Sequence, residues 1–98
     1  MGRTAAKVDG NHNEIVDALR ATNVSVQSLA EVGDGCPDIL CGCGGPGGHN
    51  FIIEIKMPGE PLRPRQKKWH ADWRGPVHVA FSVEDALQIA LRYRQPKR

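Results

Sequence analysis

Three charged residues in the middle of the chain have the types and spacing to do chemistry. Asp38 follows a proline, and sixteen residues later Glu54 and Lys56 stand two positions apart in the segment FIIEIK, residues 51–56. Successive side chains of a strand alternate between its two faces, so Glu54 and Lys56 should project from the same face. For these two residues alone, an ordinary surface ion pair is the favoured interpretation.

The position of Asp38 favours a chemical role for Glu54 and Lys56 over a surface ion pair. If residues 38–41 and 51–56 pair as a hairpin, the carboxylate of Asp38 comes toward Glu54, and two acids and one cation surround one point. Two carboxylates with no histidine between them suit a hard ion such as Mg²⁺ or Mn²⁺. Such an ion can offset the charge that develops when water cleaves a phosphodiester, while a lysine orients the water or neutralises the oxyanion. The residues therefore predict hydrolytic nuclease chemistry.

The distribution of charge indicates a polyanionic partner. Residues 1–55 carry three Lys/Arg against seven Asp/Glu, whereas residues 56–98 carry ten against four. Positive charge clustered in one half is expected of a protein that binds nucleic acid, and a solvated basic face is the alternative. Four cations of this half could contact phosphates: Arg63, Arg65, Lys67 and Lys68.

The elements that must position these residues follow from periodicity and turn signals. The pattern predicts a helix over 11–22, strands over 23–29, 38–41 and 51–56, a helix over 65–74, a strand over 76–81 and a helix capped by Ser82 and Asp85. This order, α-β-β-β-α-β-α, indicates a mixed sheet flanked by helices, of the α/β or α+β class. The length suits a single domain over 1–98, with flexible ends at about 1–10 and 94–98.

A glycine-rich segment with three cysteines offers a competing site. Cys36, Cys41, Cys43 and His49 have the spacing C-x4-C-x-C-x5-H, which supplies four zinc ligands but lacks the usual CxxC knuckle. If residues 38–41 form a strand, Cys36 and Cys41 lie at its two ends, about 15 Å apart. That separation argues against a shared ion, so reduced thiols in turns and core are the simpler expectation.

The same residues carry a family resemblance. Pro37-Asp38 followed by Glu54-Ile55-Lys56 resembles the PD-(D/E)xK signature of a nuclease superfamily. The wider pattern adds Glu14 in the first helix, Gly35-Cys36 before the PD pair, and Gln66 after the ExK strand, and it resembles the virus-type replication-repair (VRR-NUC) branch. The resemblance runs roughly from Glu14 to the last helix. It departs from the family in the turn before residue 51, which is usually poorer in cysteine and glycine.

The resemblance implies a restriction-endonuclease-like fold and a role for each matching residue. Asp38, Glu54 and the backbone carbonyl of Ile55 would bind the metal, and Lys56 would be the catalytic cation. Glu14 would reach the same ion through water, or hold a second one. For Glu14, a solvated acid in the first turn of a helix is the alternative.

Gln66 would join the catalytic group from the helix that follows the ExK strand. Periodicity places it on the same inward stripe as Leu62, Trp69 and Trp73, and an inward amide requires hydrogen-bond partners. A capping residue at the helix start is the alternative. The two tryptophans could stack on bases, but at this spacing a core pair is the expected arrangement.

These observations together predict a Mg²⁺- or Mn²⁺-dependent DNA endonuclease. The resemblance suggests branched DNA such as the Holliday (four-way) junction as substrate, and therefore a part in DNA repair and recombination. A chain of this size would best cut a symmetric junction as a two-fold homodimer. With neither a signal-peptide core nor a membrane-spanning run, a soluble protein in the cytoplasm of a bacterium or a virus-infected host is expected.

Two other functions stay open. One is a nucleic-acid-binding module that does not cleave, with or without zinc in the glycine-rich segment. The other is a nuclease that acts on linear duplex or flap DNA, because the shape of a substrate is recognised by surface geometry that one sequence does not display.

Overall fold

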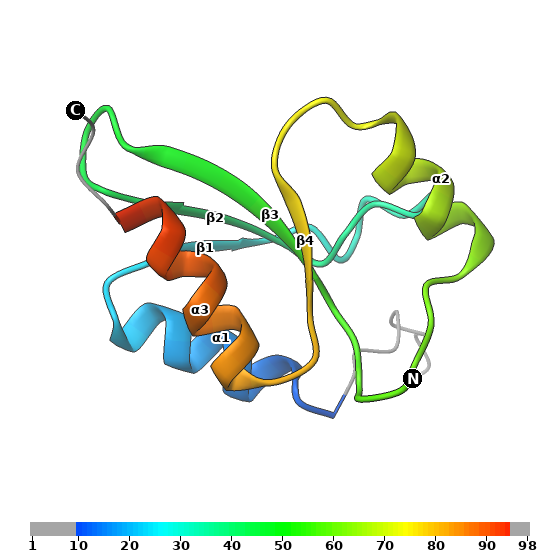
Figure 1. Cartoon of the computed structure of the whole chain (residues 1–98), viewed down its shortest axis with the longest axis horizontal. Coiled ribbons are helices and arrows are strands. Elements are labelled where there is room, and N and C mark those ends of the chain that lie inside the picture. Colours follow the sequence, from blue (N-terminus) through cyan, green and yellow to red (C-terminus); the bar gives the residue numbers. More distant parts are fainter. Residues whose placement is uncertain (1–9, 95–98) are drawn as a thin grey trace.

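The computed structural model describes residues 10–94, which form three helices and a four-stranded sheet (Figure 1). In chain order the elements are α1 (His12–Ala21), β1 (Ser25–Ser28), β2 (Ile39–Cys43), β3 (His49–Ile55), α2 (Pro64–Asp72), β4 (Val77–Ala80) and α3 (Val83–Arg94). This is a mixed α+β fold, and its order agrees with the predicted one. The predicted flexible ends lie, apart from Gly10 and Arg94, outside the described residues.

The sheet is mixed, with the strands in the order β1-β2-β3-β4. β1 pairs antiparallel with β2, and β2 pairs antiparallel with β3, whereas β4 runs parallel to β3 and is reached through α2. β2 and β3 extend further into the glycine-rich segment than predicted. The turn between them is tight, because a Cβ atom on Gly48 would lie 2.2 Å from the carbonyl oxygen of Cys43. Glycine at this position therefore allows the hairpin to close.

One face of the sheet carries the core. Phe51, Ile53 and Ile55 point from β3 toward α1 and α3, which both cover that face (Figure 1). The same cluster contains alternate residues of β2 and the apolar stripes of the two helices: Ile39, Cys41, Cys43, Ile15, Val16, Leu19, Ala86, Ile89 and Ala90. The other face receives Ile52 and Glu54, as alternation requires.

The two core helices begin differently. At α3 half of the predicted capping box is present: the backbone N–H of Asp85 donates to Ser82 Oγ over 3.0 Å, but Asp85 Oδ2 accepts from the N–H of Phe81, one residue before the cap, over 2.9 Å. α1 has no side-chain cap bond at Asn11. At the far end, Arg94 closes α3 and its guanidinium donates to the carbonyl of Thr22.

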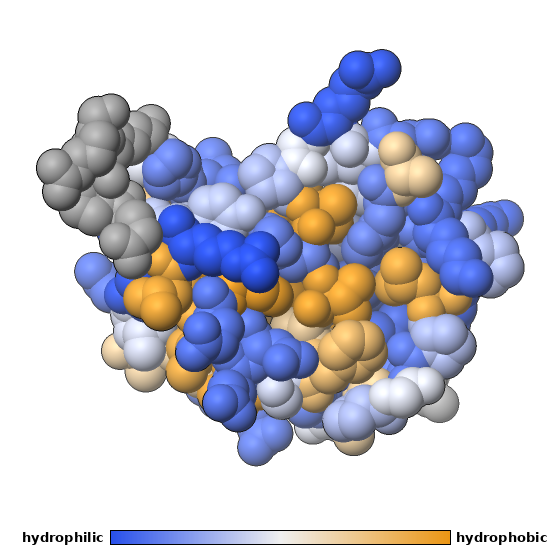
Figure 2. Space-filling view, viewed as in Figure 1, coloured by the Kyte–Doolittle hydropathy of each residue, from blue (hydrophilic) through white to orange (hydrophobic). Residues whose placement is uncertain are grey.

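α2 stands apart from the core. It contributes no buried residue, and the side of the molecule that it forms is largely hydrophilic (Figure 2). The predicted inward stripe is therefore wrong at Trp73, which is 48% exposed, and holds only in part at Leu62, Gln66 and Trp69, which are half-buried. Because α2 contributes no buried residue, packing in the core does not explain why it carries tryptophans.

Among residues 10–94, no helix has the length and apolar character that a membrane span requires.

The central position of Ile53 leads to a stability prediction. Ile53→Ala should lower the free energy of unfolding by about 2 to 5 kcal/mol, because the side chain is fully buried between β2 and both core helices. Urea unfolding followed by circular dichroism measures the change. Val32→Ala, at a position that is 61% exposed, is the matched control and should change little. Equal effects of the two substitutions would contradict this placement of the core.

Candidate active site

The strand register brings two carboxylates together. Ile39 of β2 pairs with Ile53 of β3, so Asp38, the residue just before β2, lies opposite Glu54. The backbone N–H of Ile55 donates to Asp38 Oδ2 over 2.7 Å. The carboxylate thus takes the position that the next carbonyl of the ladder would occupy if β2 began earlier. This register brings Asp38 toward Glu54, as the predicted hairpin pairing requires.

Glu54 and Lys56 are both buried, with exposed fractions of 2% and 3%. These values exclude the surface ion pair that the sequence alone left open. The ammonium group of Lys56 lies 3.9 Å from Glu60 Oε2 in the turn after β3, and Glu60 also accepts a hydrogen bond from the N–H of Met57. Charged groups tolerate burial only where hydrogen bonds and opposite charges compensate. The turn 57–60 gives Lys56 that compensation.

The backbone carbonyl of Ile55 lies on the same edge as Asp38. The N–H of Lys56 donates to the carbonyl of Ala80 over 3.0 Å, so the main chain of Lys56 faces β4. Main-chain groups of successive strand residues point to opposite edges, and those of Ile55 consequently face Asp38. The residue predicted to contribute a carbonyl ligand is oriented toward the acid pair.

Gln66 contacts both the start of α2 and Glu54. Its Oε1 accepts a hydrogen bond from the backbone N–H of Arg63 over 2.8 Å, which caps the first turn of α2. Its Nε2 donates to Glu54 Oε2 over 3.2 Å. One amide therefore links the start of α2 to the buried carboxylate and fixes the orientation of both.

His70 also faces Glu54, although no sequence pattern predicts a role for it. Its Nε2 lies 3.8 Å from Glu54 Oε1, one helical turn beyond Gln66. Burial lowers the pKa of His70 from its usual value, so a neutral imidazole stands beside the carboxylate at neutral pH. The signal available in the sequence was the spacing of four residues from Gln66, which puts both side chains on one face of a helix.

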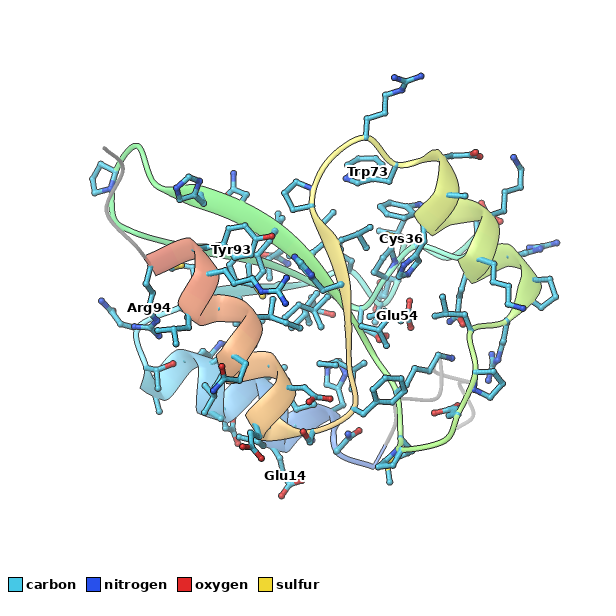
Figure 3. The ribbon with its side chains drawn as sticks, viewed as in Figure 1. Glu14, Cys36, Glu54, Trp73, Tyr93 and Arg94 are labelled. Carbon is cyan, nitrogen blue, oxygen red and sulfur yellow. The ribbon has the colours of Figure 1, made fainter. Side chains whose placement is uncertain are left out.

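Glu14 is not brought to the pair. The apolar stripe of α1 turns toward the sheet and leaves Glu14 exposed in the first turn, at the lower edge of the molecule and away from Glu54 (Figure 3). Asn11 approaches the site instead: its amide donates to the carbonyls of Lys56 and Phe81 over 3.2 and 3.0 Å. Asn11 is the N-cap residue of α1, and its long-range bonding has no signature in the local sequence.

The cysteines do not form a zinc site. Cys41 and Cys43 point into the core on the helical face of the sheet, where burial raises the pKa of Cys41 to about 12. Cys36 lies near the acid pair, since burial and then the charges of Glu54 and Asp38 raise its pKa. Cys36, which precedes β2, is therefore apart from Cys41 and Cys43, and His49 is half-buried at the start of β3, opposite Cys43. Within residues 10–94, all three cysteines are free.

Gly35 holds the acid-bearing loop against α2. It has a φ of +83°, and a Cβ atom added there would lie 2.3 Å from the carbonyl oxygen of Arg65. Only glycine fits both the left-handed backbone and this close approach. The loop that leads to Asp38 and the helix that carries Gln66 are therefore in direct backbone contact.

The donor set fits a hard divalent cation. No group of three or more His, Cys, Asp or Glu residues in the described part of the chain is arranged to hold a metal. The protein would thus supply the carboxylates of Asp38 and Glu54 and the carbonyl of Ile55, and water would complete the shell. Mg²⁺ is held in this way, by one or two carboxylates and several retained waters.

The hydrogen bonds of Asn11 lead to a second stability prediction. Asn11→Ala removes the donor to Lys56 and Phe81 and should destabilise the fold by about 1 to 3 kcal/mol, because both carbonyls lose a partner close to the core. Urea unfolding measures this loss. Asn13→Ala, at an exposed position of the same helix, is the control and should change stability far less. If the two variants unfold alike, Asn11 does not anchor the end of β3.

No protein-family model matches the chain, and no curated protein or solved structure matches it. The resemblance to PD-(D/E)xK nucleases stays a prediction from the motif. A function for the chain therefore has to follow from the positions of Asp38, Glu54, Lys56 and Gln66.

Proposed function

We propose that this chain is a metal-dependent, structure-specific DNA endonuclease of the PD-(D/E)xK type that hydrolyses phosphodiester bonds. The observation that carries the proposal is the β2–β3 register, which sets Asp38 opposite Glu54 with Lys56 two residues further along the same strand. A motif this short also arises by chance in unrelated sequences. Its acids in register and its buried lysine give it the arrangement that the chemistry needs.

Each residue has a distinct part in the proposed mechanism. Asp38, Glu54 and the carbonyl of Ile55 would hold Mg²⁺ or Mn²⁺, which supplies charge stabilisation at the phosphate and an activated water. The Ile55 N–H and the Gln66 amide fix the two carboxylates in place. Lys56 offers a buried ammonium group to the developing oxyanion or to the attacking water. Burial strengthens this interaction, because bulk water does not screen it.

The basic residues of α2 supply contacts for a polyanion. Arg63 and Lys67 are exposed, and Arg65 and Lys68 form exposed ion pairs with Asp34 and Asp72. Ion pairs of this kind contribute little to stability, so a phosphate can replace the carboxylate at small cost. Arg63 is the N-cap residue of α2, and the other three cations lie in this helix with Gln66. Phosphate contacts along α2 would therefore bring the DNA backbone to the acid pair.

The choice of substrate rests on the motif. Its resemblance to replication-repair nucleases favours branched DNA such as the Holliday junction, and hence DNA repair and recombination. The alternatives are linear duplex or flap DNA, and a nucleic-acid-binding module that does not cleave. Each of these predicts a different result with the same labelled substrates.

Cleavage of a labelled four-way junction tests the chemistry. The natural protein should cut in Mg²⁺ and not in EDTA, and both Glu54→Gln and Lys56→Met should lower the rate about 100-fold or more, since each removes a charge that stabilises the transition state. Glu31→Gln makes the same chemical change at an exposed loop position and should leave the rate unchanged. Methionine keeps the apolar stem of the buried lysine, which protects the fold.

The substrates in this experiment distinguish the competing functions. Equal cutting of a linear duplex of the same sequence would keep the chemistry and remove the preference for branched DNA. Tight binding without cleavage in Mg²⁺ or Mn²⁺ would replace the nuclease by a binding module. Full activity of Lys56→Met would show that cleavage comes from another site or a contaminant.

A two-fold homodimer is the expected assembly. A symmetric junction is cut in two strands, and two copies of one small chain related by a two-fold axis would present two acid pairs to it. Sedimentation equilibrium at the concentration of the cleavage experiment should give the mass of two chains. A mass equal to one chain, with cleavage intact, would contradict the dimer and leave the catalytic assignment in place.

A further inference from the structure

The tryptophans of α2 form an exposed stack. The rings of Trp69 and Trp73 have centroids 4.5 Å apart and planes inclined by 16°. Trp73 follows the last residue of α2, and its backbone N–H donates to the backbone carbonyl of Trp69 over 3.0 Å. No residue of this helix is buried. The stack is therefore a surface feature of a helix that takes no part in the core.

The orientation of the stack is fixed although it is exposed. Trp69 is half-buried and meets His70 edge-on, with ring centroids 6.3 Å apart. A Cβ atom on Gly75 would lie 3.1 Å from Trp73 Nε1, so the edge of that ring rests on the Gly75 backbone. One face of Trp73 contacts Trp69, and 48% of the residue is open to solvent. A rigid aromatic surface of this kind binds a planar partner at little entropic cost.

A pocket of about 210 Å³ lies beside the stack. It is lined by the two indoles together with two basic and two acidic residues: Asp34, Arg65, Lys68, Trp69, Asp72 and Trp73. Indole surfaces stack on nucleobases of any sequence, because every base has a π-face. Side-chain donors and acceptors at the rim match the polar edges of a base. The cations also match the phosphate that follows each base.

We propose that Trp69 and Trp73 stack on an unpaired nucleobase of the DNA strand next to the cleavage site. His70 follows Trp69 in the chain and lies 3.8 Å from Glu54, so the stack and the acid pair are joined by one turn of α2. Trp73 and Glu54 both lie in the region between β4 and α2 (Figure 3). The inference depends on the proposed function only in taking DNA as the ligand.

A platform formed by Trp69 and Trp73 would give the protein a preference for some DNA shapes over others. In a continuous duplex each base is covered by its neighbours, and its faces are closed to an indole. A flap or a single-stranded end exposes such a face without the cost of unstacking, and a four-way junction does so only where a base at its branch point is unpaired. The tryptophan stack would therefore select DNA with an unpaired base near the scissile bond.

Intrinsic fluorescence tests the proposal directly, because the chain has only these two tryptophans. The natural protein, in EDTA to prevent cleavage, is titrated with a single-stranded thymidine oligomer of about twelve nucleotides, within the usual site size. A fully abasic oligomer of equal length carries the same charge without bases. We expect strong quenching by the first and little by the second. Trp73→Leu should weaken binding of the thymidine oligomer roughly tenfold, Trp73→Phe less, and Leu91→Ala, at an exposed position of α3, not at all.

Three results would overturn the proposal. Equal quenching by both oligomers would show that phosphates alone bind. Unchanged affinity of Trp73→Leu for the thymidine oligomer would remove Trp73 from the contact. A fluorescence change on dilution of the protein without DNA would show that a second copy of the chain covers the stack.

The proposal and the nuclease assignment can fail separately. Metal-dependent cleavage of the junction without base-dependent quenching would keep the nuclease and remove the platform. Base-dependent quenching without cleavage in Mg²⁺ or Mn²⁺ would keep the platform and remove the nuclease. If Trp73→Leu did not fold, the abasic comparison and Trp73→Phe would still decide the matter.

Discussion

The pairing of Ile39 with Ile53 is the constraint on which the candidate site depends. It places two like charges, on Asp38 and Glu54, next to each other at a buried end of the sheet, where they repel one another. The register holds because a slip by one residue would move the whole set of core side chains of β3 to the open face. Apolar burial on one face thus maintains an unfavourable arrangement on the other.

This division separates stability from chemistry within one sheet. The face toward α1 and α3 contains the apolar cluster, including Phe51 and Ile53. The opposite face receives Glu54, whose contacts come from Gln66 and His70 of α2, a helix without buried residues. A small domain has only one core, so residues on the second face of the sheet need not be apolar and can make polar contacts. The hydrophilic surface around α2 follows from the same division (Figure 2).

Local patterns predicted the fold well and the site in part. Alternation in residues 51–56 and the hairpin pairing were sufficient to place Asp38 near Glu54, and the Ser82–Asp85 capping box was visible in the sequence. Where a contact joins distant segments, no local pattern existed. The bonds from Asn11 to Lys56 and Phe81 span 45 and 70 residues, and His70 reaches Glu54 only because α2 folds over the end of β3.

The prediction for the tryptophans failed for a related reason. A spacing of four residues shows that two side chains share a helical face, but it does not say what that face meets. α2 is attached through polar and backbone contacts, namely the Gln66 amide and the close approach of Gly35 to Arg65, and none of its residues is buried. A helix held in this way can keep large aromatic groups at the surface without loss of core packing. Because Gln66 and His70 lie on the same short helix as Trp69, any ligand bound by the indole rings is held within one helical turn of the residues that contact Glu54.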